Sequence, residues 1–116
     1  MSENENEIEV TPAEAQRRFE AGEVQLVDVR EQSEWDASHI PGDVKHIPIG
    51  ELQSRASEIG KDKPVVFQCR VGGRSLMAAQ AFRAAGFEAY SLAGGLIDWS
   101  AQGLPVEPEG APVADH

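Results

Sequence analysis

The sequence predicts an α/β fold, a three-layer α/β/α domain with a central five-stranded parallel sheet. Short apolar segments typical of buried strands alternate with helical segments along almost the whole chain. The connections between them are only a few residues long. This is the pattern of a parallel sheet whose crossover helices cover both faces. The length of 116 residues fits one domain with one hydrophobic core.

Five segments predict the strands of this sheet. They are short and contain β-branched or aromatic residues, and charged residues, Gly or Pro bound most of them. The segment that contains Val65, Val66 and Phe67 is the most apolar and gives the strongest strand prediction. In the first segment apolar and polar residues alternate, so this strand is expected at a sheet edge. The predicted strands are residues 8–10, 24–29, 44–47, 64–68 and 89–92.

The helices are predicted from their start and stop signals. The first has Thr11 as N-cap, Pro12 at the first helical position and Glu14 three residues after the cap. Glycines follow most of the predicted helices, as they do at helix C-termini. The predicted helices are residues 12–21, 33–38, 51–59, 75–85 and 96–101.

The formal net charge of −10 is concentrated at the two ends of the chain. Seven of the 20 acidic residues lie in the first and last ten residues, which contain no Lys or Arg. We therefore predict acidic tails at residues 1–7 and 107–116 around a domain at residues 8–106. Such a charge disfavours nucleic acid as a partner. No apolar run is long enough to span a membrane, and the N-terminus lacks a signal-peptide pattern, so a cytoplasmic monomer is expected.

The run from Gln68 to Ser75 follows the strongest strand and leads into a helix. In open parallel sheets, ligands bind at the carboxyl ends of the strands. Two glycines allow this loop to curl, and Ser75 is expected to cap the helix. A curled loop at a helix N-terminus directs several N–H groups at one centre, which favours an anion. With Arg70 and Arg74 nearby, the same field favours the nucleophilic thiolate of Cys69.

Cys69 is the only cysteine, which excludes an intramolecular disulfide. A lone cysteine is more often a small buried apolar residue than a nucleophile. Two arginines and two glycines within five residues of it favour the functional interpretation here.

On these residues the chain resembles the single-domain rhodaneses, the thiosulfate sulfurtransferase family, over about residues 8–106. The run 69–75 is similar to the family's active-site loop of Cys, two variable residues, Gly, one variable residue, Arg and Ser. Two flanking signatures agree with it in order and spacing. They are residues 28–30 with 34–35 and 39–42, and residues 94–99 with 103–106. Ser38 and Asp43 depart from the commoner Gly and Ala, both away from the cysteine.

The resemblance implies a persulfide mechanism. The Cys69 thiolate would attack the outer sulfur of thiosulfate and expel sulfite, and cyanide or a thiol would then remove the sulfur from Cys69. The substrate-binding residues would be those of the loop, Arg70, Val71, Gly72, Gly73, Arg74 and Ser75. Their N–H groups would hold the persulfide, and the two arginines would hold the sulfonate. The resemblance implies neither a metal nor an organic cofactor.

Two alternatives remain beside this reading. Phosphatases and arsenate reductases of the same fold resemble His-Cys, five variable residues and Arg, whereas here Gln68 precedes Cys69 and four residues separate it from Arg74. The shorter loop suits one sulfur atom better than a tetrahedral oxyanion. A sulfur carrier or regulatory module that passes sulfur to a protein acceptor would need the same cysteine.

The remaining polar and aromatic candidates are interpreted as supporting residues. Asp28 and Arg30, at the end of a strand, are expected to brace neighbouring loops through hydrogen bonds. His39 is expected to stabilise a turn, because a thiolate exchange needs no general base. Trp35 and Trp99 are expected to pack near the rim of the site.

Overall fold

The computed structural model describes residues 7–108 and Val113. Its five strands form one parallel sheet in the order β1-β5-β4-β2-β3. The predicted five-stranded parallel sheet is thus confirmed, with the short first strand at an edge. Most of the two predicted acidic tails, residues 1–6, 109–112 and 114–116, lies outside the described residues. The strands are β1 (Glu9–Val10), β2 (Gln25–Asp28), β3 (Lys45–His46), β4 (Val65–Gln68) and β5 (Ala89–Leu92).

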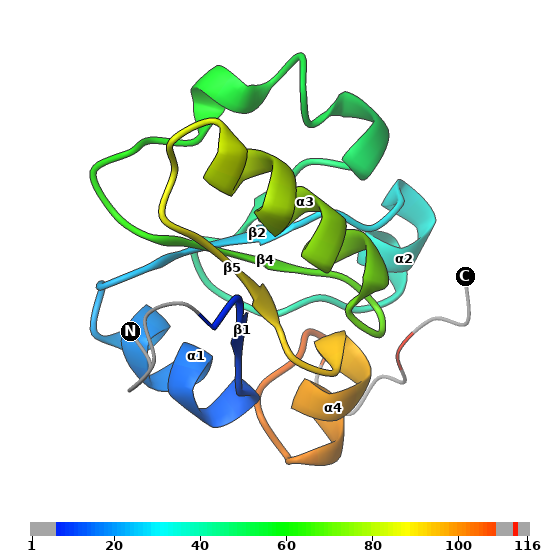
Figure 1. Ribbon diagram of the computed structural model, residues 1–116. Helices are drawn as coiled ribbons and strands as arrows, with labels where there is room; N and C mark the ends of the chain where they lie inside the picture. Colours follow the sequence, from blue (N-terminus) through cyan, green and yellow to red (C-terminus); the bar gives the residue numbers. More distant parts are fainter. Residues whose placement is uncertain (1–6, 109–112, 114–116) are drawn as a thin grey trace.

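Helices cover both faces of the sheet, as predicted (Figure 1). One face packs against α3 through Ala78, Ala79 and Phe82, and the other packs against α1 and α4 through side chains that include Ala15 and Trp99. The helix α2 lies beyond the carboxyl end of β2. The helices are α1 (Pro12–Glu20), α2 (Gln32–Ala37), α3 (Gly73–Ala84) and α4 (Gly95–Ala101).

The predicted helix at residues 51–59 is wrong. The structure has two short 3₁₀ helices there, η1 (Ile49–Glu51) and η2 (Ala56–Glu58). The Ser54 hydroxyl donates to the Glu51 carbonyl oxygen, and the guanidinium of Arg55 binds the carboxylates on both sides of it. Serine hydroxyls compete with the backbone for hydrogen bonds in this way and disfavour a continuous α-helix.

Local signals placed the other helices well. The Thr11 side chain accepts a hydrogen bond from the Glu14 N–H at 3.2 Å, and Pro12 is the first residue of α1. Every residue of β4 and β5 is buried, as expected for central strands covered on both faces. No helix in the described part of the chain is long and apolar enough to cross a membrane.

Strand register sets the position of the candidate site. In the paired strands β2 and β4, Asp28 lies beside Gln68. Because both strands run in the same direction, the residues that follow them, Arg30 and Cys69, emerge at the same edge of the sheet. The loops that carry most of the polar candidates therefore meet there.

Candidate functional site

The site is built on the loop that joins β4 to α3 and on the first residues of α3. We call residues 69–75 the Cys69 loop. Cys69 directly follows β4 and is only 1% exposed. Gly72 adopts φ +112°, which glycine tolerates best, and acts as the N-cap of α3. The helix therefore begins at Gly73, two residues earlier than predicted. The expected capping role of Ser75 is wrong, because Ser75 lies inside the first helical turn.

The Cys69 sulfur lies in a small group of hydrogen-bond donors. The N–H of Gly72 donates to Sγ at 3.1 Å and the N–H of Ser75 donates to it at 3.4 Å. The thiol is also 3.5 Å from Ser75 Oγ, to which it can donate. Two backbone dipoles thus point at the sulfur from the curled loop and the first turn of α3, an arrangement that stabilises negative charge there.

The backbone of the Cys69 loop is held by the start of α4. The N–H of Leu96 donates to the carbonyl oxygen of Cys69 at 2.8 Å, and the N–H of Ile97 donates to that of Arg70 at 3.0 Å. In a trans peptide, the N–H points opposite to the carbonyl. The N–H groups of Arg70 and Val71 are therefore turned away from α4.

Gly95 is required for this close approach. A Cβ on Gly95 would lie 2.5 Å from the carbonyl oxygen of Arg70 and 2.6 Å from that of Cys69, and the residue has φ +62°. The sequence signal for it was the glycine pair in the C-terminal signature, although its physical role could not be read without the structure.

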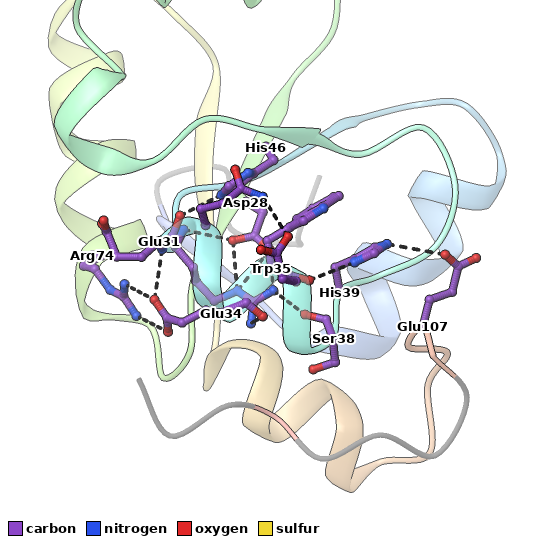
Figure 2. A network of polar contacts seen from close by, with 12 residues as sticks. Asp28, Glu31, Glu34, Trp35, Ser38, His39, His46, Arg74 and Glu107 are labelled. Carbon is purple, nitrogen blue, oxygen red and sulfur yellow. Dashed lines mark hydrogen bonds and ion pairs between the residues drawn. The ribbon is translucent and has the colours of Figure 1, made fainter.

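Arg74 forms an ion pair with another residue of the chain. Its guanidinium binds the carboxylate of Glu34 with two hydrogen bonds, Nη1 to Oε1 at 2.7 Å and Nη2 to Oε2 at 2.9 Å (Figure 2). Glu34 is fully buried, and its hydrogen bonds raise the pKa of Arg74 above the usual arginine value. The sequence interpretation missed this role of Glu34. A local signal existed, since Glu31 and Glu34 form a capping box at the start of α2.

A second ion pair fixes α2 to the sheet. The Arg30 guanidinium donates to both carboxylate oxygens of Asp28, the shortest bond being 2.7 Å, and both side chains are fully buried. It also donates to the carbonyl oxygen of Ser38 at 2.8 Å and to that of Glu34 at 3.4 Å. The bracing hydrogen bonds predicted for Asp28 and Arg30 are present. We call Asp28, Arg30, Glu34 and Arg74 the α2 brace.

The aromatic candidates lie around α2 and in the core. Trp35 stacks between two imidazole rings, with centroids 4.0 Å from His39 and 4.9 Å from His46 (Figure 2). His39 also binds the Trp35 carbonyl oxygen and lies 3.4 Å from the Glu107 carboxylate, which fits the predicted turn-stabilising role. Trp99 is fully buried and donates to the Pro105 carbonyl oxygen, so it is a core residue.

The predicted site residues thus separate into two groups. The structure gathers Cys69, Gly72 and Ser75 around one sulfur atom. Arg74 belongs to the α2 brace, while Arg70 is half-buried and Val71 is 57% exposed on the loop. A sulfur anion held by backbone donors on a curled loop can act as a nucleophile and can carry a covalently bound group.

Comparison with known proteins gives consistent results. The family model of the rhodanese-like domain matches residues 11–102. A sulfurtransferase of Allochromatium vinosum is 40% identical over 98 residues, covering 83% of this chain and 91% of that protein. An HTH-type transcriptional regulator of Mycobacterium tuberculosis is 49% identical over 107 residues, covering 90% of this chain but only 46% of the regulator. The crystal structure of a rhodanese-related protein from Thermoplasma volcanium superposes with a TM-score of 0.80 at 27% identity, covering 87% of this chain and 98% of the other.

Proposed function

The chain belongs to the rhodanese-like domain family, and on this premise we propose that it transfers the outer sulfur of thiosulfate to a thiophilic acceptor through a persulfide on Cys69. In the first step the Cys69 thiolate attacks the outer sulfur. The bond from that sulfur to the sulfonate breaks, and sulfite leaves with the electron pair. In the second step cyanide or a thiolate takes the sulfur, and the electron pair of the S–S bond returns to Cys69.

The observation that carries this proposal is the set of neutral donors around Sγ. Both steps begin or end with an anionic Cys69 sulfur, and the N–H groups of Gly72 and Ser75 are already directed at it. Donors fixed before the reaction stabilise such charge without reorganisation. The shortness of the loop also supports sulfur chemistry over phosphate chemistry.

The arginines take different roles in this mechanism. The guanidinium of Arg74 binds Glu34, and this ion pair positions the start of α3 against α2. We assign the sulfonate to Arg70, the half-buried arginine next to Cys69, together with the N–H groups of Arg70 and Val71, which are turned away from α4. From the sequence, both arginines are expected to hold the sulfonate, whereas this role is proposed for Arg70 alone.

The test is a measurement of sulfur loading followed by turnover. We expect mass spectrometry to find one added sulfur atom on Cys69 after incubation with thiosulfate, and cyanide to remove it as thiocyanate. The Cys69→Ser chain should gain no sulfur. Wild-type protein that stays unloaded and forms no thiocyanate would overturn the proposal.

A second candidate is a regulatory module that is loaded with sulfur but turns over slowly. The relative that favours it is the mycobacterial transcriptional regulator, less than half of which corresponds to this chain. The same experiment separates the two. A regulatory module would load with sulfur but would release it to small acceptors far more slowly than it loads.

A further inference from the structure

A second hydroxyl lies behind the Cys69 loop. Ser91, on β5, is fully buried, and its Oγ is 2.7 Å from Ser75 Oγ. Ser75 Oγ in turn is 3.2 Å from the Gly72 carbonyl oxygen and 3.5 Å from Cys69 Sγ. A series of hydrogen bonds, Ser91–Ser75–Cys69, therefore runs from the central sheet to the sulfur. Nothing in the loop motif includes Ser91, which is 16 residues from Ser75.

Each hydroxyl has one proton to donate, and this decides which of Ser91 and Ser75 is the donor in the hydrogen bond between them. Within the described residues, Ser75 is the hydrogen-bond partner of the Ser91 hydroxyl. If Ser75 donated to Ser91, the Ser91 proton would be buried without an acceptor, which is unfavourable. Ser91 therefore donates to Ser75, and the single Ser75 proton remains available for the Gly72 carbonyl oxygen or the Cys69 sulfur.

The state of the sulfur selects between these two acceptors. When Cys69 is a thiol, its S–H donates to Ser75 Oγ, and Ser75 donates to Gly72. When the sulfur is anionic it has no proton to give, and it becomes the stronger acceptor, because hydrogen bonds to charged acceptors are the stronger ones. The Ser75 hydroxyl can then turn to the sulfur without losing the bond that it accepts from Ser91.

We propose that Ser91 is a positioning residue, which holds the Ser75 hydroxyl so that its proton is donated to Cys69 whenever that sulfur is anionic. The inference rests on the proposed function for its importance in turnover. In the second step, the bond between Cys69 Sγ and the outer sulfur breaks and the electron pair stays on Sγ. Ser91 thereby assists the departure of Cys69 as a thiolate.

The first measurement is the ultraviolet absorbance of the Cys69 thiolate against pH. Cys69 is the only cysteine, so subtracting the curve of Cys69→Ser leaves the signal of one thiol. In Ser91→Ala we expect the midpoint to move to higher pH. Arg74, which interacts electrostatically with Cys69, and its partner Glu34 stay the same in every variant, as does Arg70 beside Cys69 in the sequence.

The second measurement is the rate at which cyanide discharges a preloaded persulfide. Ser91→Ala should slow this step about threefold to tenfold, the effect of one hydrogen bond between two neutral hydroxyls. Ser91→Thr keeps the hydroxyl and should restore most of both properties. Ala89→Gly is the matched control, because it removes one carbon atom from the same face of β5 but no hydrogen-bonding group.

Two results would overturn the inference. One is an unchanged midpoint and discharge rate in Ser91→Ala. The other is an equal change in Ser91→Ala and Ala89→Gly, which would indicate loss of packing alone. If wild-type protein forms no persulfide, the proposed function fails, while the absorbance curves still test the role of Ser91.

Discussion

The Cys69 sulfur and the α2 brace lie where the neighbouring strands β4 and β2 end, but different kinds of electrostatic interaction hold them. Neutral groups contact the sulfur: two backbone N–H groups donate to it, and the Ser75 hydroxyl oxygen lies 3.5 Å from it. The brace consists of full charges paired with each other, and its members are buried except for Arg74, which is partly exposed. The two regions thus differ: dipoles face the sulfur of the proposed nucleophile, whereas the charged pairs fix the geometry around it.

The largest effect is expected from the sulfur itself. Cys69→Ser should lower thiosulfate:cyanide turnover below about 1% of wild type, because loss of a covalent nucleophile costs orders of magnitude. The melting temperature should stay close to that of wild type, since the serine oxygen can accept the same two N–H bonds. Steady-state kinetics and thermal melts on one preparation check both statements. Turnover well above that limit would mean that Cys69 is not the nucleophile.

A change that displaces the backbone of the Cys69 loop should lower activity almost as strongly. Gly95→Ala places a Cβ against two loop carbonyl oxygens at a positive φ. We expect kcat/KM to fall about 10²-fold or more, the cost of a misplacement of about 1 Å. Gly50→Ala is the control, because a Cβ there meets nothing within 4 Å and φ is not positive. Equal activities of the two variants would show that α4 does not position the loop.

The α2 brace should respond mainly in stability. Arg74→Ala leaves the buried Glu34 carboxylate unpaired and should lower the free energy of unfolding by about 2–4 kcal/mol. This is somewhat below the range of about 3–5 kcal/mol for fully buried pairs, because Arg74 is 28% exposed. Activity should fall about tenfold in kcat/KM through the displaced loop. Denaturant unfolding checks the stability term.

Arg74→Lys sharpens that experiment. It keeps the charge but not the two parallel hydrogen bonds, so it should recover part of the stability lost in Arg74→Ala. A full loss of activity at unchanged stability would instead assign Arg74 to the substrate.

The smallest effect is expected at an exposed ion pair outside the Cys69 loop and the α2 brace, the pair of Arg55 and Glu58. Hydrogen bonds from Arg55 lower the pKa of Glu58 below its usual value. The pair therefore stabilises the fold above the unfolded-state pKa, and this contribution is lost as the pH falls through the folded-state pKa. Glu58→Gln should lower the melting temperature less than Arg74→Ala at neutral pH. The difference from wild type should vanish on acidification, as thermal melts at several pH values can check.

The sequence predicted the features that depend on local signals. The cap formed by Thr11 and Pro12, the alternation of strands and helices, and the glycine-rich turn after Cys69 each lie within a few residues. Side-chain pairs set by the order of the strands were not predictable in this way. Glu34 and Arg74 are 40 residues apart and meet only because β2 and β4 are neighbours.

The contact between the hydroxyls of Ser75 and Ser91 was also not predictable from local sequence, since the two residues meet only through the pairing of β5 with β4. The segment 51–59 failed for another reason. Its helical composition is offset by hydrogen bonds from Ser54 and Arg55 to groups within the segment.

The burial of Cys69 has a consequence for the regiochemistry of sulfur release. A persulfide offers an attacking thiolate two sulfur atoms. Attack on the inner sulfur would leave the protein as a mixed disulfide and release the outer sulfur as sulfide. The sulfur would then be lost without being transferred to the acceptor. Cys69 is 1% exposed, so the inner atom is shielded, while the outer atom extends about 2 Å farther from Cys69. In the proposed reaction, this burial directs the acceptor to the outer sulfur, whose capture regenerates the free cysteine.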